Sequence, residues 1–127
     1  MLFRSNTSTR YAGSYSAQAG LSAPTNGDSK LSQTVIAPAG ATKITFWYYN
    51  VCLGGGTSRD YAMATLYDAT ALKTTTVLSK TCTLAGTWRQ VTASVVVGRT
   101  YTLTLINHDD NRVGQGTYSL FDSVTFT

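Results

Sequence analysis

Apolar and polar side chains alternate with a period of two along most of the chain, which is the pattern of strands with one buried face. Within residues 41–51, Ile44, Phe46 and Tyr48 are large apolar residues at alternate positions, so their side chains point to the same face of a strand. Residues 59–67 repeat the pattern with smaller apolar residues. We expect one buried face to be formed by Ile44, Phe46, Tyr48, Ala62, Ala64, Leu66, Tyr101, Leu103 and Leu105.

The composition agrees with an all-β chain. There are 22 Thr, 12 Ser and 8 Tyr residues, against 6 Asp and no Glu. Thr and Tyr favour pleated, half-buried surfaces, whereas the residues that favour helices are scarce. A helical bundle and a coiled coil are therefore excluded, and no stretch approaches the ~18 consecutive apolar residues of a membrane-spanning helix.

The strand-like segments are short, evenly spaced and bounded mostly by Gly, Pro, Asn or Asp. With 127 residues, the chain is expected to form a single β-sandwich domain over residues 1–127. About eight antiparallel strands in a jelly roll are the economical arrangement. The expected strands are residues 13–18, 31–36, 41–51, 59–67, 74–82, 88–97, 100–107 and 117–127.

The net charge is +4, but the ten basic residues are scattered along the sequence. Nucleic-acid binding needs basic side chains gathered on one face, where they displace counterions together. We therefore expect a mildly basic, solvated surface and no nucleic-acid partner.

Cys52 and Cys82 are the two cysteines of the chain. In a β sequence rich in Thr, Ser and Gly, the two cysteines predict one structural disulfide, and hence a secreted or cell-surface protein. Two reduced core cysteines are the alternative. Zinc is disfavoured, because the single histidine, His108, adds only one further ligand to the two thiols.

Catalytic motifs are scarce. No GxSxG nucleophile elbow, P-loop or dinucleotide fingerprint is present. Adjacent carboxylates at Asp109 and Asp110 suit chelation better than the opposed acid and base of a glycosidase. A small hydrolase would rest on His108 and these two aspartates alone, so we expect a protein that is not an enzyme.

The densest polar cluster is residues 107–111, with the sequence NHDDN. One interpretation is a polar turn, since Asn and Asp end strands and tolerate left-handed backbone. The other is a loop that binds a polar ligand through His108, Asp109, Asp110 and Asn111.

Aromatic residues form the second candidate site. If the face opposite the core is solvated, Trp47, Tyr49, Tyr61 and Tyr67 would form a strip of rings across neighbouring strands. Rings with polar tips suit stacking against the apolar side of a sugar, and Arg59 would add hydrogen bonds. The alternative is that another layer covers this face and the rings are sandwich residues.

Asp122 is the third candidate. Alternation places Tyr118, Leu120, Val124 and Phe126 inward, and Asp122 then falls on the same apolar side. A buried carboxylate needs either a partner within the protein or a cation. Calcium, which takes six to eight oxygen ligands, is the natural cation.

Five segments of the chain stand in the order found in a known group of domains. Together they resemble the galactose-binding-like jelly-roll modules of secreted bacterial hydrolases and peptidases, such as carbohydrate-binding modules and the non-catalytic domains of immune inhibitor A-type metalloproteases. The segments are YAGSYSA (residues 11–17), GDSKLSQ (27–33), TFWYY (45–49), NHDDN (107–111) and TYSLFD (117–122).

The resemblance implies a structural calcium site and a separate sugar site. Asp122, in the last-strand motif, would be a calcium ligand, and Asp28 is the second candidate ligand. Sugar would bind on the concave sheet or in the loops at one end. Such modules begin with an additional strand, and because only ten residues precede Tyr11 we expect that strand to be missing.

The resulting hypothesis is a non-catalytic carbohydrate-binding module of a secreted bacterial protein, forming part of a larger polypeptide. The alternative is a structural or adhesive accessory module, since a missing first strand would leave an edge open to a partner strand. The predicted ligand-binding residues are Tyr49, Arg59, Tyr61, Tyr67, His108, Asp109, Asp110 and Asn111.

Overall fold

The computed structural model describes residues 3–6, 16–20, 26–53, 57, 59–84, 86–111 and 116–127. Nine strands lie within these ranges, one more than the eight expected. They are β1 (Phe3–Asn6), β2 (Ser16–Gly20), β3 (Asn26–Ile36), β4 (Lys43–Cys52), β5 (Tyr61–Asp68), β6 (Lys73–Thr81), β7 (Trp88–Ser94), β8 (Thr100–Asp110) and β9 (Thr117–Phe126).

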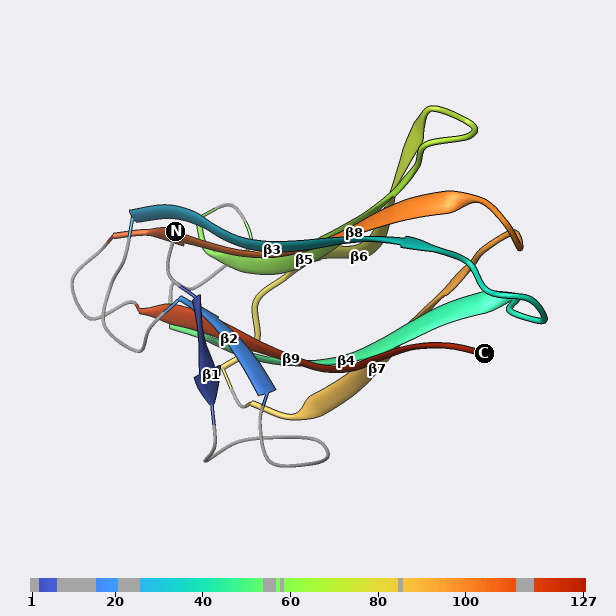
Figure 1. The fold of residues 1–127 in the computed structure, drawn as a ribbon. Coiled ribbons are helices and arrows are strands. Elements are labelled where there is room, and N and C mark those ends of the chain that lie inside the picture. The colour runs from blue at the N-terminus through green and yellow to red at the C-terminus, as the bar shows by residue number, and fades with distance from the viewer. Residues whose placement is uncertain are drawn as a thin grey trace.

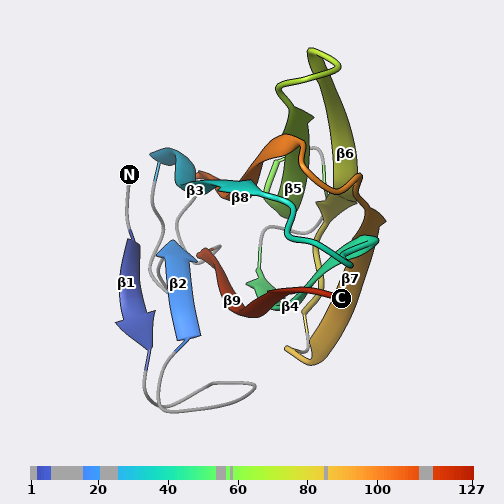
Figure 2. The same cartoon turned by 45° about the vertical axis from the view of Figure 1, so that its right-hand side comes forward.

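The strands form two layers packed face to face (Figures 1 and 2). One sheet has the order β1-β2-β9-β4-β7 and the other has the order β3-β8-β5-β6, with every pairing antiparallel. Only β1–β2 and β5–β6 are consecutive strands that pair with each other, so elsewhere the chain crosses from one sheet to the other. This interleaving is the predicted jelly roll.

Strand β1 corrects the expectation that the first strand is missing. Residues Phe3–Asn6 pair with Ser16–Gly20 of β2, which in turn pairs with β9. The sequence pattern missed this strand because four residues are too few to show an alternation. The edge of β2 that a missing first strand would have left open is therefore paired with β1, which is itself the end strand of this sheet.

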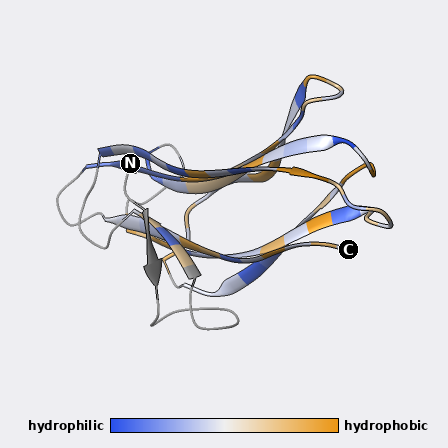
Figure 3. Ribbon diagram, in the orientation of Figure 1, coloured by the Kyte–Doolittle hydropathy of each residue, from blue (hydrophilic) through white to orange (hydrophobic). Residues whose placement is uncertain are grey.

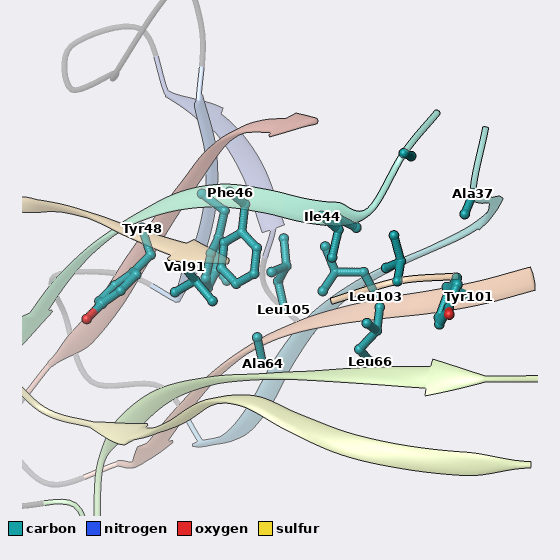
Figure 4. Packing of buried hydrophobic residues seen from close by; sticks show 14 residues of the cluster. Ala37, Ile44, Phe46, Tyr48, Ala64, Leu66, Val91, Tyr101, Leu103 and Leu105 are labelled. Carbon is teal, nitrogen blue, oxygen red and sulfur yellow. The ribbon is translucent and has the colours of Figure 1, made fainter. Parts of the chain in front are cut away.

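The hydrophobic core lies between the layers, as the alternation predicted. Ile44 and Phe46 of β4 point toward the layer that contributes Leu103 and Leu105 of β8, and Tyr48 belongs to the same buried cluster (Figure 4). Each fully buried side chain of this size contributes about 1.5–3 kcal/mol by leaving water. Figure 3 shows hydrophobic and hydrophilic residues interspersed along both layers, and in β5 buried residues alternate with half-buried ones.

Strand β9 departs from the predicted alternation. Phe121, not Leu120, joins the core cluster, and its ring lies 6.5 Å from that of Phe46. The register shifts where Thr45 pairs with Thr125 and Trp47 pairs with Asp122, so β9 holds one extra residue there. This bulge includes Ser123, whose φ is 53°, and it reverses the phase of the strand.

Beyond the apolar core, buried polar side chains connect the two sheets. Asn107 of β8 donates from Nδ2 to the Thr117 carbonyl oxygen (2.8 Å), and its Oδ1 accepts from the Ser119 hydroxyl (2.7 Å). Asn50 of β4 donates to the same Ser119 oxygen (3.1 Å) and accepts from the Thr83 N–H (2.9 Å). The network makes this end of the interior polar, and its hydrogen bonds link β8 of one sheet to β9 and β4 of the other.

The predicted disulfide is confirmed. Cys52 ends β4 and Cys82 follows β6, and their sulfur atoms are bonded with 5.2 Å between the Cα atoms. The bond joins the two sheets beside the polar network, because Cys52 pairs in register with Thr117. Among the described residues, no helix is long and apolar enough to cross a membrane.

Candidate functional site

The outer face of the β3-β8-β5-β6 sheet carries a row of chemically active side chains. Asp28 of β3 pairs with His108 of β8, and His108 pairs with Tyr61 of β5. Directly paired residues point to the same face of a sheet. Because Ala62 and Leu105 point into the core, these three side chains point outward.

The rings of Tyr61 and His108 are stacked. Their centroids are 4.9 Å apart and their planes differ by 17°. The ammonium group of Lys80, on β6, lies 4.5 Å from the centroid of the Tyr61 ring, within the range of a cation–π contact. The aromatic pair therefore stands between acidic and basic groups contributed by the outer strands.

Asp28 connects this row to charge at the edge of the sheet. Its Oδ1 lies 2.6 Å from Nδ1 of His108, and its Oδ2 lies 3.7 Å from Nζ of Lys30. Burial raises the pKa of Tyr61 above its ordinary value of 10.0, and the negative charge of Asp28 raises it further. The Tyr61 hydroxyl therefore keeps its proton, and can donate a hydrogen bond, at neutral pH.

Hydroxyl groups continue along the same face. Ser32 and Thr104 are 3.0 Å apart, and Thr34 and Thr102 are 2.8 Å apart, measured between side-chain oxygens. Tyr67 pairs in register with Thr102, six residues along β5 from Tyr61. At about 3.4 Å per residue, the two tyrosines stand roughly 20 Å apart on one face.

Tyr49 is not on this face, which corrects the expectation of one aromatic strip. Strand β4 belongs to the other sheet, so Trp47 and Tyr49 lie on the opposite layer from Tyr61 and Tyr67. The Tyr49 ring packs against Trp88 with 5.4 Å between centroids, and Gly86 also lies against it. These contacts fit the alternative in which Tyr49 is a packing residue.

The predicted polar loop is divided between surface and interior. Asp109 is fully buried, and its two oxygens accept hydrogen bonds from the N–H groups of Asn111 (2.9 Å) and Thr117 (3.0 Å). This corrects the expectation that Asp109 faces a ligand beside His108. Asn111 and Arg59 are exposed at the end of the sheet, while Asp110 is half-buried.

Asp122 and Asp28, the two predicted calcium ligands, lie on different sheets. Because of the bulge in β9, Asp122 pairs with Trp47, away from the core face, and its Oδ1 accepts from the Ser123 N–H (2.7 Å). Asp28 is engaged with His108 and Lys30. The expectation that alternation buries Asp122 on the apolar side is therefore wrong, and this pair of residues does not form one site.

A different acidic group could hold a metal ion. Asp60, Asp109 and Asp110 each place a carboxylate oxygen within 4.8 Å of the others. Asp109 and Asp110 were expected to suit chelation, but no pattern in the sequence connects Asp60 with them. Only the pairing of β5 with β8 brings Asp60 to them, 49 positions before Asp109 in the chain.

A cavity of about 380 Å³ lies at the other end of the sandwich. Its walls include Leu66, Val77 and Tyr101, together with an ion pair of 2.9 Å between Arg99 and Asp68. None of the predicted site residues lines it.

Comparison with solved structures shows the jelly-roll β-sandwich fold of carbohydrate-binding modules. A family 61 module, TmCBM61, solved with beta-1,4-galactotriose, has a TM-score of 0.61 and 16% identity, covering 98% of this chain and 81% of that one. A family 16 carbohydrate-binding module has a TM-score of 0.59 and 13% identity, covering 97% and 83%.

An adhesin domain has the same fold. The K2 cleaved adhesin domain of Lys-gingipain has a TM-score of 0.53 and 21% identity, covering 95% of this chain and 75% of that one. No protein-family profile and no curated protein matches the sequence.

Proposed function

We propose that the chain is a non-catalytic carbohydrate-binding module that binds glycan on the outer face of the β3-β8-β5-β6 sheet. The observation that carries the proposal is the Tyr61–His108 ring pair, flanked by Asp28 and Lys80. Sugar recognition needs an apolar surface for C–H groups and hydrogen-bonding groups around it for hydroxyls. The Tyr61 and His108 rings offer the apolar surface, and Asp28 and Lys80 on either side of them offer the hydrogen-bonding groups.

Lys80 has a specific part in this proposal. Its ammonium group lies over the Tyr61 ring, where the apolar side of a sugar would stack. The Lys80 side chain is exposed, and a cation–π contact at an exposed site contributes only about 0.5–1 kcal/mol. A sugar displaces Lys80 from the ring, and the ammonium group then donates to a sugar hydroxyl.

Tyr67 extends the site. A ligand that contacts both tyrosines crosses the Ser32–Thr104 and Thr34–Thr102 hydroxyl pairs, which donate and accept hydrogen bonds. Such a ligand is an extended oligosaccharide lying along β5. Arg59 and Asn111 add polar contacts at the Tyr61 end.

The cellular setting is part of the same proposal. The Cys52–Cys82 disulfide supports an oxidising compartment, and we place the protein outside the cell or on its surface, as one domain of a larger bacterial protein. The structures it resembles include a module solved with a galactotriose and a cleaved adhesin domain. We further propose that calcium stabilises the fold.

The test is affinity gel electrophoresis against a panel of soluble polysaccharides. We expect retardation by at least one of them. Tyr61→Ala and Tyr67→Ala should each weaken that affinity about 5- to 10-fold, since an aromatic contact contributes about 1–1.5 kcal/mol and 1.4 kcal/mol is tenfold.

The matched control is Tyr49→Ala, which removes a tyrosine from the opposite layer and should leave affinity unchanged. Circular dichroism of each variant confirms that it is folded. If no polysaccharide retards the protein, or if the Tyr61/Tyr67 double variant binds as wild type does, this function is wrong and a structural or adhesive role takes its place.

A further inference from the structure

Buried oxygen atoms gather at the end of the sandwich where β8 ends and β5 and β9 begin (left in Figure 1). Asp60 directly precedes β5, Asp109 and Asp110 end β8, and Thr117 begins β9. The side chains of Asp60, Asp109 and Thr117 are fully buried, with 0% exposure. One carboxylate oxygen from each aspartate lies within 4.8 Å of the other two.

Hydrogen bonds fix these side chains and still leave oxygen atoms unused. Asp60 Oδ1 accepts from the Asp110 N–H (2.9 Å), and Asp109 Oδ2 accepts from the Thr117 N–H (3.0 Å). Among the described residues, neither Asp60 Oδ2 nor the Thr117 hydroxyl oxygen has a hydrogen-bond partner. Buried polar atoms without partners are rare and point to a bound water or ion.

Thr117 is the second observation that points to a ligand, because its side chain is fully buried beside the carboxylates and its hydroxyl oxygen has no hydrogen-bond partner among the described residues. This hydroxyl lies near the Asp60 carboxyl, but the two groups do not meet in hydrogen-bonding geometry. A site that gathers three carboxylates and a hydroxyl inside the protein calls for positive charge.

We propose that Asp60, Asp109, Asp110 and the Thr117 hydroxyl bind one Ca²⁺ ion. The four groups offer only oxygen, the donor that hard cations prefer, and contain no nitrogen or sulfur donor for zinc. Calcium–oxygen distances are about 2.3–2.6 Å, so ligands on opposite sides of the ion lie about 4.6–5.2 Å apart. Oxygens that lie within 4.8 Å of one another fit this geometry, and water completes the six to eight ligands.

The position of the ion gives it two structural effects. It connects β5 and β8 of one sheet to β9 of the other, beside the Cys52–Cys82 bond. Asp60 and Asp109 also directly adjoin Tyr61 and His108, on the opposite side of the same two strands. The ion therefore fixes the strand ends from which the stacked rings project.

The experiment measures thermal unfolding and isothermal titration calorimetry of the chelator-treated protein with CaCl₂, MgCl₂ or ZnCl₂. We expect calcium to raise Tm by about 5–15 °C at 100 times its Kd. Asp60→Asn and Thr117→Val should lose most of this rise and weaken calcium binding at least tenfold. Asp122→Asn, a matched change on β9, should respond as wild type does.

Asp60→Asn distinguishes ion binding from a folding defect. Removing a buried charge should leave Tm without calcium unchanged or higher, while the calcium response is lost. The proposal is overturned if wild-type protein shows neither a Tm rise nor binding heat with millimolar calcium. It is equally overturned if Asp122→Asn abolishes the response while Asp60→Asn retains it.

A role of the ion in glycan affinity rests on the proposed function, whereas ion binding does not. Unfolding and calorimetry with calcium alone use no sugar, so a protein that binds calcium and no polysaccharide refutes only the carbohydrate-binding proposal. A protein that binds polysaccharide equally with calcium and with chelator, and shows no Tm rise, refutes the ion site and the stabilisation of the fold by calcium, but not the carbohydrate-binding proposal.

Discussion

The ring of Tyr61 on β5 lies parallel to the ring of His108 on β8, at 4.9 Å and 17°, although the two residues are 47 positions apart. Both side chains are half-buried on the outer face of the sheet, where the pairing of β5 with β8 places them next to each other. Asp28 contacts the imidazole from the neighbouring strand. The pairing of β3 with β8 and of β8 with β5 therefore places a carboxylate, an imidazole that can form hydrogen bonds and a tyrosine ring next to one another.

Replacing His108 separates packing from hydrogen bonding in this pair. His108→Phe keeps a ring against Tyr61 but removes Nδ1 from Asp28, so we expect stability within about 1 kcal/mol of wild type. Affinity for a polysaccharide that binds wild type should fall several-fold, because the imidazole hydrogen bonds are lost. Affinity gels and urea unfolding measure the two effects, and unchanged affinity in His108→Phe would leave His108 with a packing role only.

The disulfide should contribute strongly to stability. Cys52 and Cys82 are 30 positions apart, and a loop of that length is expected to stabilise the fold by about 3–4 kcal/mol on the chain-entropy account. Urea unfolding of a Cys52→Ala/Cys82→Ala variant measures the loss. If wild type and the variant unfold at the same urea midpoint with the same m-value, the disulfide does not stabilise the fold as predicted.

Gly20 and Gly40 offer a matched test of the polar network. Both have positive φ, 80° and 84°, so alanine strains either position. A Cβ at Gly20 would also collide with the Asn107 side chain and the Thr117 carbonyl, whereas a Cβ at Gly40 meets nothing within 4 Å. We expect Gly40→Ala to lower the free energy of unfolding by about 1–2 kcal/mol, and Gly20→Ala to lower it by about 1–3 kcal/mol more. Denaturant unfolding measures both losses, and equal losses would argue against tight packing around Gly20.

Because the pKa of Asp68 is lowered in the folded state, the free energy of unfolding should decrease at acidic pH. The N–H of Ala71 chiefly, with further help from Arg99 and the N–H of Thr70, lowers the pKa of the Asp68 carboxyl below its ordinary value of 3.8. Its stabilising contribution is therefore complete above pH 3.8 and is lost as the pH falls through the lowered pKa of the folded state. Urea midpoints across this range should decline more steeply for wild type than for Asp68→Asn, and parallel curves would refute the linkage.

Local pattern was sufficient to assign the two faces of several strands. On β4, β5 and β8, alternation correctly placed Phe46, Ala64 and Leu105 inward and Tyr61 outward. On β9 it was wrong, because one extra residue near Ser123 reverses the phase, and nothing in the surrounding residue types signals a bulge. Asp122 was misplaced for that reason alone.

The sequence by itself determined the all-β class, the alternation that builds the core and the availability of two cysteines for one bond, because each depends on residue type and local spacing. Only the tertiary structure decided that Tyr49 and Tyr61 lie on opposite layers, that Asp28 contacts His108 from 80 positions away, and that Asp60 joins Asp109. Each of these depends on which strands pair and in which register. That choice is made by packing across the whole sandwich, between segments that are distant in the chain.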